Sequence, residues 1–155
     1  MTDSSFGYEK PEDSPGLLLW QTTTLWQKQI KVELDQHGMT HSQFVVLAVA
    51  SWFCEHKVEA TQVDIADLSK MEKMTVSKAL REFTQHGFVK RREHKTDTRA
   101  KVVQVTSKGA QKTKKLIPLV ESIDERFFFC LGKQGRKSII SSLRSLVDQY
   151  SEARS

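Results

Sequence analysis

The sequence contains no long apolar run and only two cysteines. None of its 155 residues belongs to a stretch approaching the roughly 18 consecutive apolar residues of a membrane span, so we expect a soluble protein without membrane contact. The N-terminal residues lack the basic start and apolar run of a secretory signal, which favours a cytoplasmic location. Cys54 and Cys130 lack the paired spacing of a metal knuckle or a redox motif, so we expect both to be reduced, buried packing residues.

Residue patterns typical of catalysis are also missing. The sequence shows no nucleophile with a base, no paired carboxylates suited to a cleft and no phosphate-cradling loop, so we expect neither an enzyme nor a cofactor. Glu33, His37 and His41 could approach one another as metal ligands. The helix predicted after residue 107 offers no histidine to complete that set, and we expect no metal ion.

Positive charge is plentiful and concentrated in one short segment. The chain carries a net charge of +5, and the six cations and two anions of residues 90–101 account for +4 of it. β-Branched and aromatic residues flank this segment at 88–89 and 102–105, which predicts a β-hairpin. Charge this concentrated usually has a polyanionic partner, so the hairpin is predicted to be a DNA-binding wing. A solvated hairpin is the alternative.

Helical periodicity predicts four helices before the hairpin. We expect them at about residues 17–36, 40–53, 61–68 and 74–86. Thr40 with Gln43 forms a capping-box signature, Thr61 opens the third helix, and Gly87 ends the fourth. A brief turn over residues 69–73 joins the last two helices, which is the helix-turn-helix pattern.

Two more helices are expected after the hairpin, and an irregular arm over residues 1–15 precedes the first helix. An apolar stripe predicts a long helix from residue 107 to 131, bent at Pro118. Gly132 and Gly135 indicate a break before a last amphipathic helix. The long helix exceeds what a small wing domain can cover, so it needs another partner.

This order of elements resembles the MarR family of dimeric winged-helix transcriptional regulators. The resemblance lies in the segments HGMTHSQFVVLAVA, MTVSKALREFTQHGFVKR and DTRAKVVQVTSKG and in the pair of C-terminal helices. It implies a mainly α fold with a small β-wing in a single domain over residues 16–152. A winged helix-turn-helix core at about 40–106 would lie between dimerisation helices at about 17–36 and 107–152.

The resemblance also implies how such a protein would act. A homodimer would bind a pseudo-palindromic double-stranded DNA operator, with half-sites roughly 34–36 Å apart. Regulators of this family are commonly tuned by a small molecule, so we expect a repressor with a small aromatic effector. A winged-helix module that binds an acidic protein, and a metal- or redox-sensing regulator of the same fold, are the alternatives.

The predicted recognition helix can read base pairs only through side chains near its N-terminal half. Thr75 and Ser77 suit base edges or phosphates, and Lys78 can reach a guanine or the backbone. Arg81 can grip a phosphate with its planar guanidinium. Glu72 stands where the resemblance would place a short capping residue, which leaves the start of this helix open.

The preceding helix and the wing supply the other candidate DNA contacts. Thr61 and Gln62 can present a hydroxyl, an amide and free N–H groups to a phosphate. Of the two arginines at 91–92, adjacent in a strand, only one can face the DNA.

At the wing tip, Arg99 is expected to enter the minor groove. The carboxylate of Asp97 would pair with the Arg99 guanidinium and fix its direction. Lys95 and Lys101 would add nonspecific attraction to phosphates.

Aromatic side chains gather on the first two predicted helices, which would wall an effector pocket. We take Trp26, Phe44 and Trp52 as its candidate lining residues. Core or dimer packing is the alternative for these aromatics, because large rings dominate buried area in any fold.

Overall fold

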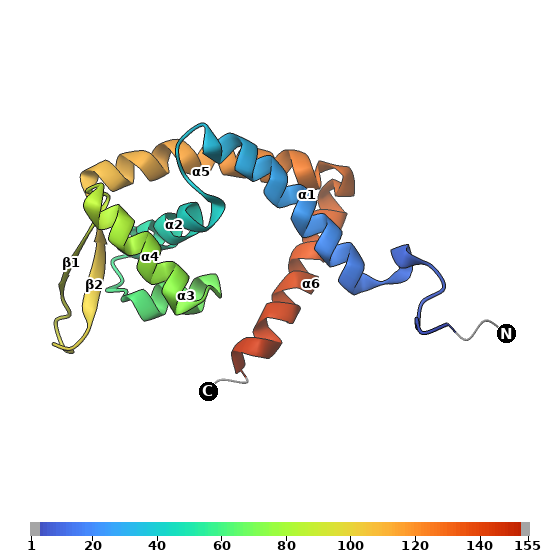
Figure 1. Ribbon diagram of the computed structural model, residues 1–155, viewed down its shortest axis with the longest axis horizontal. Coiled ribbons are helices and arrows are strands. Elements are labelled where there is room, and N and C mark those ends of the chain that lie inside the picture. Colours follow the sequence, from blue (N-terminus) through green and yellow to red (C-terminus); the bar gives the residue numbers. More distant parts are fainter. Residues whose placement is uncertain (1–3, 153–155) are drawn as a thin grey trace. The chain divides into compact units, whose positions relative to one another are not determined.

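The structure, a computed structural model, describes residues 4–152 and divides the chain into two compact units, Met1–Val120 and Glu121–Ser155. The elements are α1 (Pro15–Asp35), α2 (His41–Glu55), α3 (Gln62–Ser69), α4 (Lys73–Gln85), β1 (Val89–Glu93), β2 (Lys101–Val105), α5 (Ser107–Phe128) and α6 (Gly132–Glu152) (Figure 1). Short 3-10 turns add Pro11–Asp13 and Phe129–Leu131. The predicted fold, mainly helical with a small β-wing, is confirmed. The single domain over residues 16–152 stays a prediction.

Local signals set the boundaries of the helices in the first unit. The Thr40 hydroxyl accepts a hydrogen bond from the Gln43 amide at 3.1 Å, and the Gln43 side chain accepts one from the Thr40 amide at 2.9 Å. This reciprocal pair starts α2, as predicted. Gly87 has φ +73°, a left-handed conformation that glycine adopts without strain, and it follows the end of α4.

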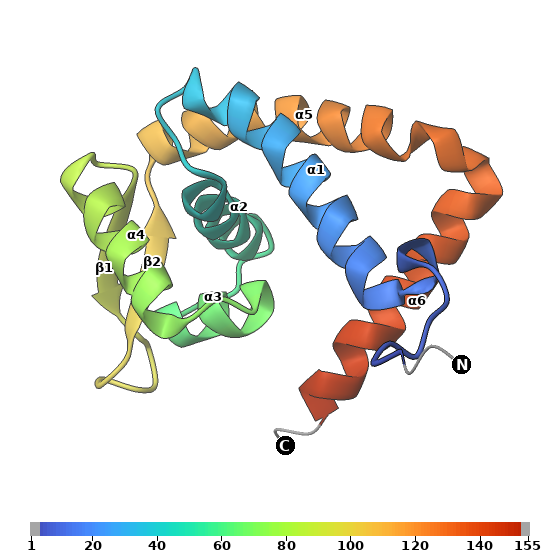
Figure 2. The same cartoon turned by 45° about the vertical axis from the view of Figure 1, so that its right-hand side comes forward.

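The core of the first unit lies between α2, α3, α4 and the two-stranded sheet, which pack on one another (Figure 2). Each element contributes its apolar face, and the side chains of Leu47, Ile65, Val76 and Leu80 are fully buried. The strands pair antiparallel, with Val89 opposite Val105 and Glu93 opposite Lys101. The helix-turn-helix and the wing therefore share one hydrophobic core.

The structure corrects the predicted boundary between the last two helices. Gly132 ends the break, and Gly135 is not part of it. The break falls on residues 129–131, and α6 begins at Gly132 and continues through Gly135. Gly132 has φ +63°, which redirects the backbone, whereas Gly135 remains helical because glycine weakens a helix without forbidding it.

Both cysteines are less buried than predicted. Cys130 is exposed because it lies in the 3-10 turn after α5, outside the helical stripe to which the sequence assigned it. Cys54 is partly exposed at the edge of β2, where its sulfur accepts a hydrogen bond from the Val105 amide at 3.5 Å. The prediction that both are buried packing residues was wrong.

Large apolar side chains remain exposed in both units. In α1 only Ile30 and Leu34 are buried, and the exposed side chains include Leu18, Leu19, Trp20 and Leu25. In α6 the exposed apolar side chains are Ile140, Leu143, Leu146, Val147 and Tyr150. Within residues 4–152, no helix combines the length and the apolar character that a membrane crossing requires.

Candidate nucleic-acid interface

Helix α4 places the four predicted recognition residues on its outer side. It buries Val76, Ala79, Leu80 and Phe83, and the 3.6-residue period turns Lys78 and Arg81 away from this core. Thr75, Lys78 and Arg81 are exposed and Ser77 is half-buried beside them. Neither Lys78 nor Arg81 makes an ion pair with any of the described residues. Both cations can therefore reach an external anion.

The start of α4 lies one residue earlier than predicted. The helix begins at Lys73, and Glu72 occupies the N-cap position with an extended backbone. Its side chain makes no capping hydrogen bond, because its carboxylate stands one methylene farther from the backbone than that of a preferred cap such as aspartate. The first-turn N–H groups of α4 are thus left without this side-chain acceptor.

Helix α3 holds Thr61 and Gln62 at its N-terminal end. Thr61 and Asp64 form a capping box, and the Thr61 hydroxyl also donates to Asp64 Oδ2 at 2.8 Å. Gln62 Oε1 accepts a hydrogen bond from Arg91 Nη2 at 3.1 Å. The Thr61 hydroxyl proton is therefore engaged within the helix end, whereas the Gln62 side-chain N–H groups stay available beside the Arg91 cation.

The two adjacent arginines of β1 separate, as strand geometry requires. Arg91 is exposed beside Gln62, and Arg92 pairs with Glu59 through an Nη2–Oε1 contact of 2.5 Å. Sequence reasoning left open which of the two faces DNA. Arg92 forms an ion pair with Glu59. Arg91 makes no ion pair with any described residue and donates a hydrogen bond to Gln62, so Arg91 remains the candidate to face DNA.

On the side of the wing to which Arg92 points, Glu59 lies close to three basic side chains. Its hydrogen bond from Arg92 lowers the pKa of the Glu59 carboxyl against the opposing effect of burial. His94 Nε2 lies 3.7 Å from Glu59 Oε2, and Lys95 Nζ lies 3.9 Å from Glu59 Oε1. Lys95 is thus partly neutralised within the protein, as is Lys101, whose Nζ lies 3.9 Å from Glu93 Oε1.

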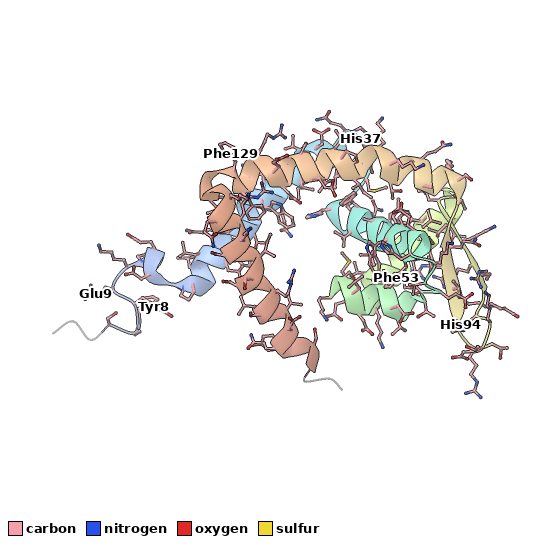
Figure 3. The ribbon with its side chains drawn as sticks, turned by 180° about the vertical axis from the view of Figure 1, so that it is seen from behind. Tyr8, Glu9, His37, Phe53, His94 and Phe129 are labelled. Atoms are coloured by element: carbon pink, nitrogen blue, oxygen red, sulfur yellow. The ribbon has the colours of Figure 1, made fainter. Side chains whose placement is uncertain are left out.

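The wing tip is organised by backbone hydrogen bonds, and Figure 3 shows His94 at this hairpin. His94 Nδ1 accepts from the amides of Thr96 and Asp97, each at 3.2 Å. Asp97 Oδ1 accepts from the Arg99 amide at 3.0 Å. The Arg99 side chain is exposed and makes no ion pair with any described residue.

Two features of the tip differ from the expectation. Asp97 fixes the Arg99 backbone and does not pair with its guanidinium, because a carboxylate two residues earlier in a tight turn reaches the nearby N–H first. His94 was not predicted, and the sequence gives only a weak signal for it. Its role follows from the turn that places two amides beside one imidazole nitrogen.

The three candidate effector residues lie in different surroundings. Phe44 is buried in α2, and the Trp26 ring of α1 lies edge-on to His41 with ring centroids 5.1 Å apart. The Trp52 ring, half exposed, stacks on His56 at 4.2 Å. Two cavities of about 420 and 290 Å³ are lined by other residues. The effector pocket stays a prediction.

The three residues considered as metal ligands make two separate contacts. His37 Nε2 lies 3.6 Å from Glu33 Oε1, and the His41 ring faces Trp26. Within residues 4–152, no group of three or more His, Cys, Asp or Glu side chains is arranged to hold a metal ion.

We expect Glu59→Gln to destabilise the wing fully above the ordinary carboxyl pKa of 4.5, with an effect that shrinks as pH falls from 4.5 through the lowered pKa of the folded state. A carboxyl whose pKa is lowered by folding contributes stability that is present above the unfolded-state pKa and lost as pH falls through the folded-state value. Thermal unfolding followed by circular dichroism from pH 3 to 8 measures this difference. Glu93→Gln removes an exposed acid of the same wing and should change little. Identical unfolding midpoints for parent and Glu59→Gln across the whole pH range would refute the anchoring role.

Known proteins are similar to this chain in sequence and in the arrangement of its helices and strands. The family model described as "ArnR1-like, winged-helix domain" matches residues 35–123. The Bacillus subtilis protein YdcH, described as an uncharacterized HTH-type transcriptional regulator, is 33% identical over 140 residues, covering 90% of this chain and 94% of YdcH.

Solved structures agree on the fold. CouR from Rhodococcus jostii RHA1, bound to p-coumaroyl-CoA, matches with a TM-score of 0.80 and 19% identity, covering 90% of this chain and 96% of CouR. The S. aureus MepR–DNA complex matches with a TM-score of 0.78 and 18% identity, covering 91% of this chain and 99% of MepR. With its winged-helix core and helix-turn-helix relatives, the chain belongs to the MarR family of winged helix-turn-helix transcriptional regulators.

Proposed function

We propose that this protein is a homodimeric transcriptional repressor that binds a pseudo-palindromic double-stranded DNA operator. The observation that carries the proposal is a set of three exposed cations that make no ion pair within residues 4–152. Lys78 and Arg81 lie on the outer side of α4, and Arg99 lies at the tip of the wing. Such a protein would act in the cytoplasm and would have no catalytic role.

The three cations suit different parts of a duplex. A helix in the major groove contacts bases with its N-terminal residues, which here include Thr75, while Lys78 and Arg81 meet the phosphate backbone. An arginine on a hairpin is suited to a narrow minor groove, where negative potential is concentrated. Arg91 and Gln62 form a second polar pair that can contact a phosphate at the start of α3.

The exposed apolar side chains of α1 and α6 support a dimer. Trp20 is 72% exposed and Tyr150 is 74% exposed, and further leucines and isoleucine are exposed on the same two helices. A monomer rarely leaves so many large apolar side chains in water, and a second copy of the chain would cover them. The proposed dimer would present two wing domains to two half-sites.

Effector control is the second part of the proposal. The neighbour CouR was solved with p-coumaroyl-CoA bound, which is a precedent for a ligand with an aromatic group in this fold. Titration with phenolic acids and with p-coumaroyl-CoA should change the fluorescence of Trp26 and Trp52 if an effector binds beside them. No change in fluorescence and no change in operator affinity across the panel would remove this part.

We expect Lys78→Ala to weaken the salt dependence of DNA binding. Each phosphate contact adds about 0.9 to the slope of log K against log salt, so losing one lysine from each of two subunits should lower the slope by roughly 2. Fluorescence anisotropy with a labelled operator between 50 and 300 mM salt measures it. Lys114→Ala, which removes an exposed lysine of α5, serves as the matched control.

The same titration separates DNA binding from a protein-interaction role. If Lys78→Ala and the parent show one slope, Lys78 does not contact phosphate. If random duplex DNA competes as well as the operator at every salt concentration, sequence-specific regulation is contradicted.

A further inference from the structure

One large apolar side chain of α4 lies outside the core, on the outer side of the helix. Met74 is the second residue of the helix and is 84% exposed. Other side chains of α4 fill the core side of the helix, since Val76 and Leu80 are fully buried. Met71, the residue before the N-cap, is half-buried. An apolar residue at this position commonly packs on the fourth residue of the helix, which here is Val76. Met74 is therefore not needed to start or anchor the helix.

Helical geometry places Met74 among the candidate DNA contacts. Residues four and seven positions apart share one face of a helix, so Met74 lies in line with Lys78 and Arg81. The buried side chains Val76, Leu80 and Phe83 lie on the opposite face. If α4 enters the major groove, Met74 is on the side that meets the base edges, in the first turn where base contacts concentrate.

The chemistry of the side chain selects the group that it can recognise. A thioether cannot donate a hydrogen bond and accepts one only weakly, so it gains little from a phosphate or from the polar edges of guanine, cytosine and adenine. Thymine alone among the four bases presents a methyl group in the major groove. Methionine is long, unbranched and flexible enough to cover such a group.

We infer that Met74 is a specificity-determining residue that contacts the C5-methyl group of a thymine in each operator half-site. The inference rests on the proposed function, since it requires α4 to lie in the major groove. Met74 would add an apolar base contact to the polar contacts of Thr75, Lys78 and Arg81. The inference predicts a thymine at one fixed position of each half-site.

Replacing single thymines by uracil tests the inference directly, because uracil lacks only the methyl group. The operator is first selected from a random duplex library with the full-length parent protein. Each symmetric thymine pair is then changed to uracil, and dissociation constants are measured for the parent, Met74→Ala, Met74→Leu and a control, Leu68→Ala, which truncates an exposed apolar side chain of α3.

We expect one thymine pair at which uracil weakens the parent by roughly fifteenfold, which corresponds to burying about one methyl group per half-site. Met74→Ala should bind the thymine operator more weakly than the parent by a similar factor. Uracil at that pair should not weaken the binding of Met74→Ala any further. Met74→Leu should keep most of the sensitivity to the methyl group, and Leu68→Ala should keep all of it.

Equal uracil penalties in the parent and Met74→Ala at every position would overturn the inference and leave the proposed function standing. Failure to select any sequence from the library would overturn both. The two failures are distinguishable because the selection step reads DNA binding alone.

Discussion

Leu143→Asp is expected to dissociate the dimer and to weaken operator binding by roughly 10²–10⁴-fold. Leu143 is 40% exposed on the apolar side of α6, between the exposed Ile140 and Val147. A second subunit would cover this side, and an aspartate there would be buried without a partner. A dissociated subunit can occupy one half-site only and loses the gain from linking two contacts. Sedimentation velocity and anisotropy measure the two effects.

Ser141→Asp is the matched control for this variant. It introduces the same charge into the same helix at an exposed position on the polar side of α6. Both variants place one aspartate in α6 and change the net charge equally, while Ser141→Asp leaves the apolar side intact. A Leu143→Asp protein that sediments as the parental dimer would show that α6 does not form the subunit contact.

Arg99→Ala is expected to weaken operator binding by roughly thirtyfold without altering the fold. The side chain is exposed and makes no ion pair within residues 4–152, so the protein loses no internal contact of this kind. A contact of about 1 kcal/mol from each of two subunits gives this factor. The loss should be largest for operators with A·T-rich flanks, where the minor groove is narrow.

Arg126→Ala removes an equal charge from an exposed position of α5 outside the wing and should leave affinity nearly unchanged. Lys95→Ala and Lys101→Ala should have intermediate effects, because Glu59 and Glu93 already neutralise these lysines in part. Unfolding midpoints equal to that of the parent would confirm that only binding has changed. An Arg99→Ala protein with parental affinity would exclude the wing tip from the interface.

Local chemistry explains why most of the fold was predictable. The capping boxes at Thr40 and Thr61 mark two helix starts, and Gly87 marks the end of α4 because a left-handed residue suits that position. The strands follow from β-branched residues on both sides of a polar turn. Each of these signals acts over a few residues, so the sequence displays it directly.

The details that were missed depend on contacts between distant residues. Glu59 and Arg92 stand 33 positions apart, and no spacing rule links them. The same holds for the contact between Arg91 and Gln62. Asp97 was assigned to the right neighbour but to the wrong group, since a turn decides whether a backbone amide or a side chain is nearer. Packing, not local pattern, decides which arginine of the wing forms an ion pair within the protein.

Hydroxyl-radical footprinting of the full-length protein on its selected operator tests the central claim most directly. If two subunits place α4 and the wing on neighbouring half-sites, protection should appear as two equivalent blocks about one helical turn apart on one face of the duplex. Minor-groove protection at the outer flanks should disappear in Arg99→Ala. Protection that is uniform along any duplex, or a single block that Arg99→Ala leaves unchanged, would contradict the account.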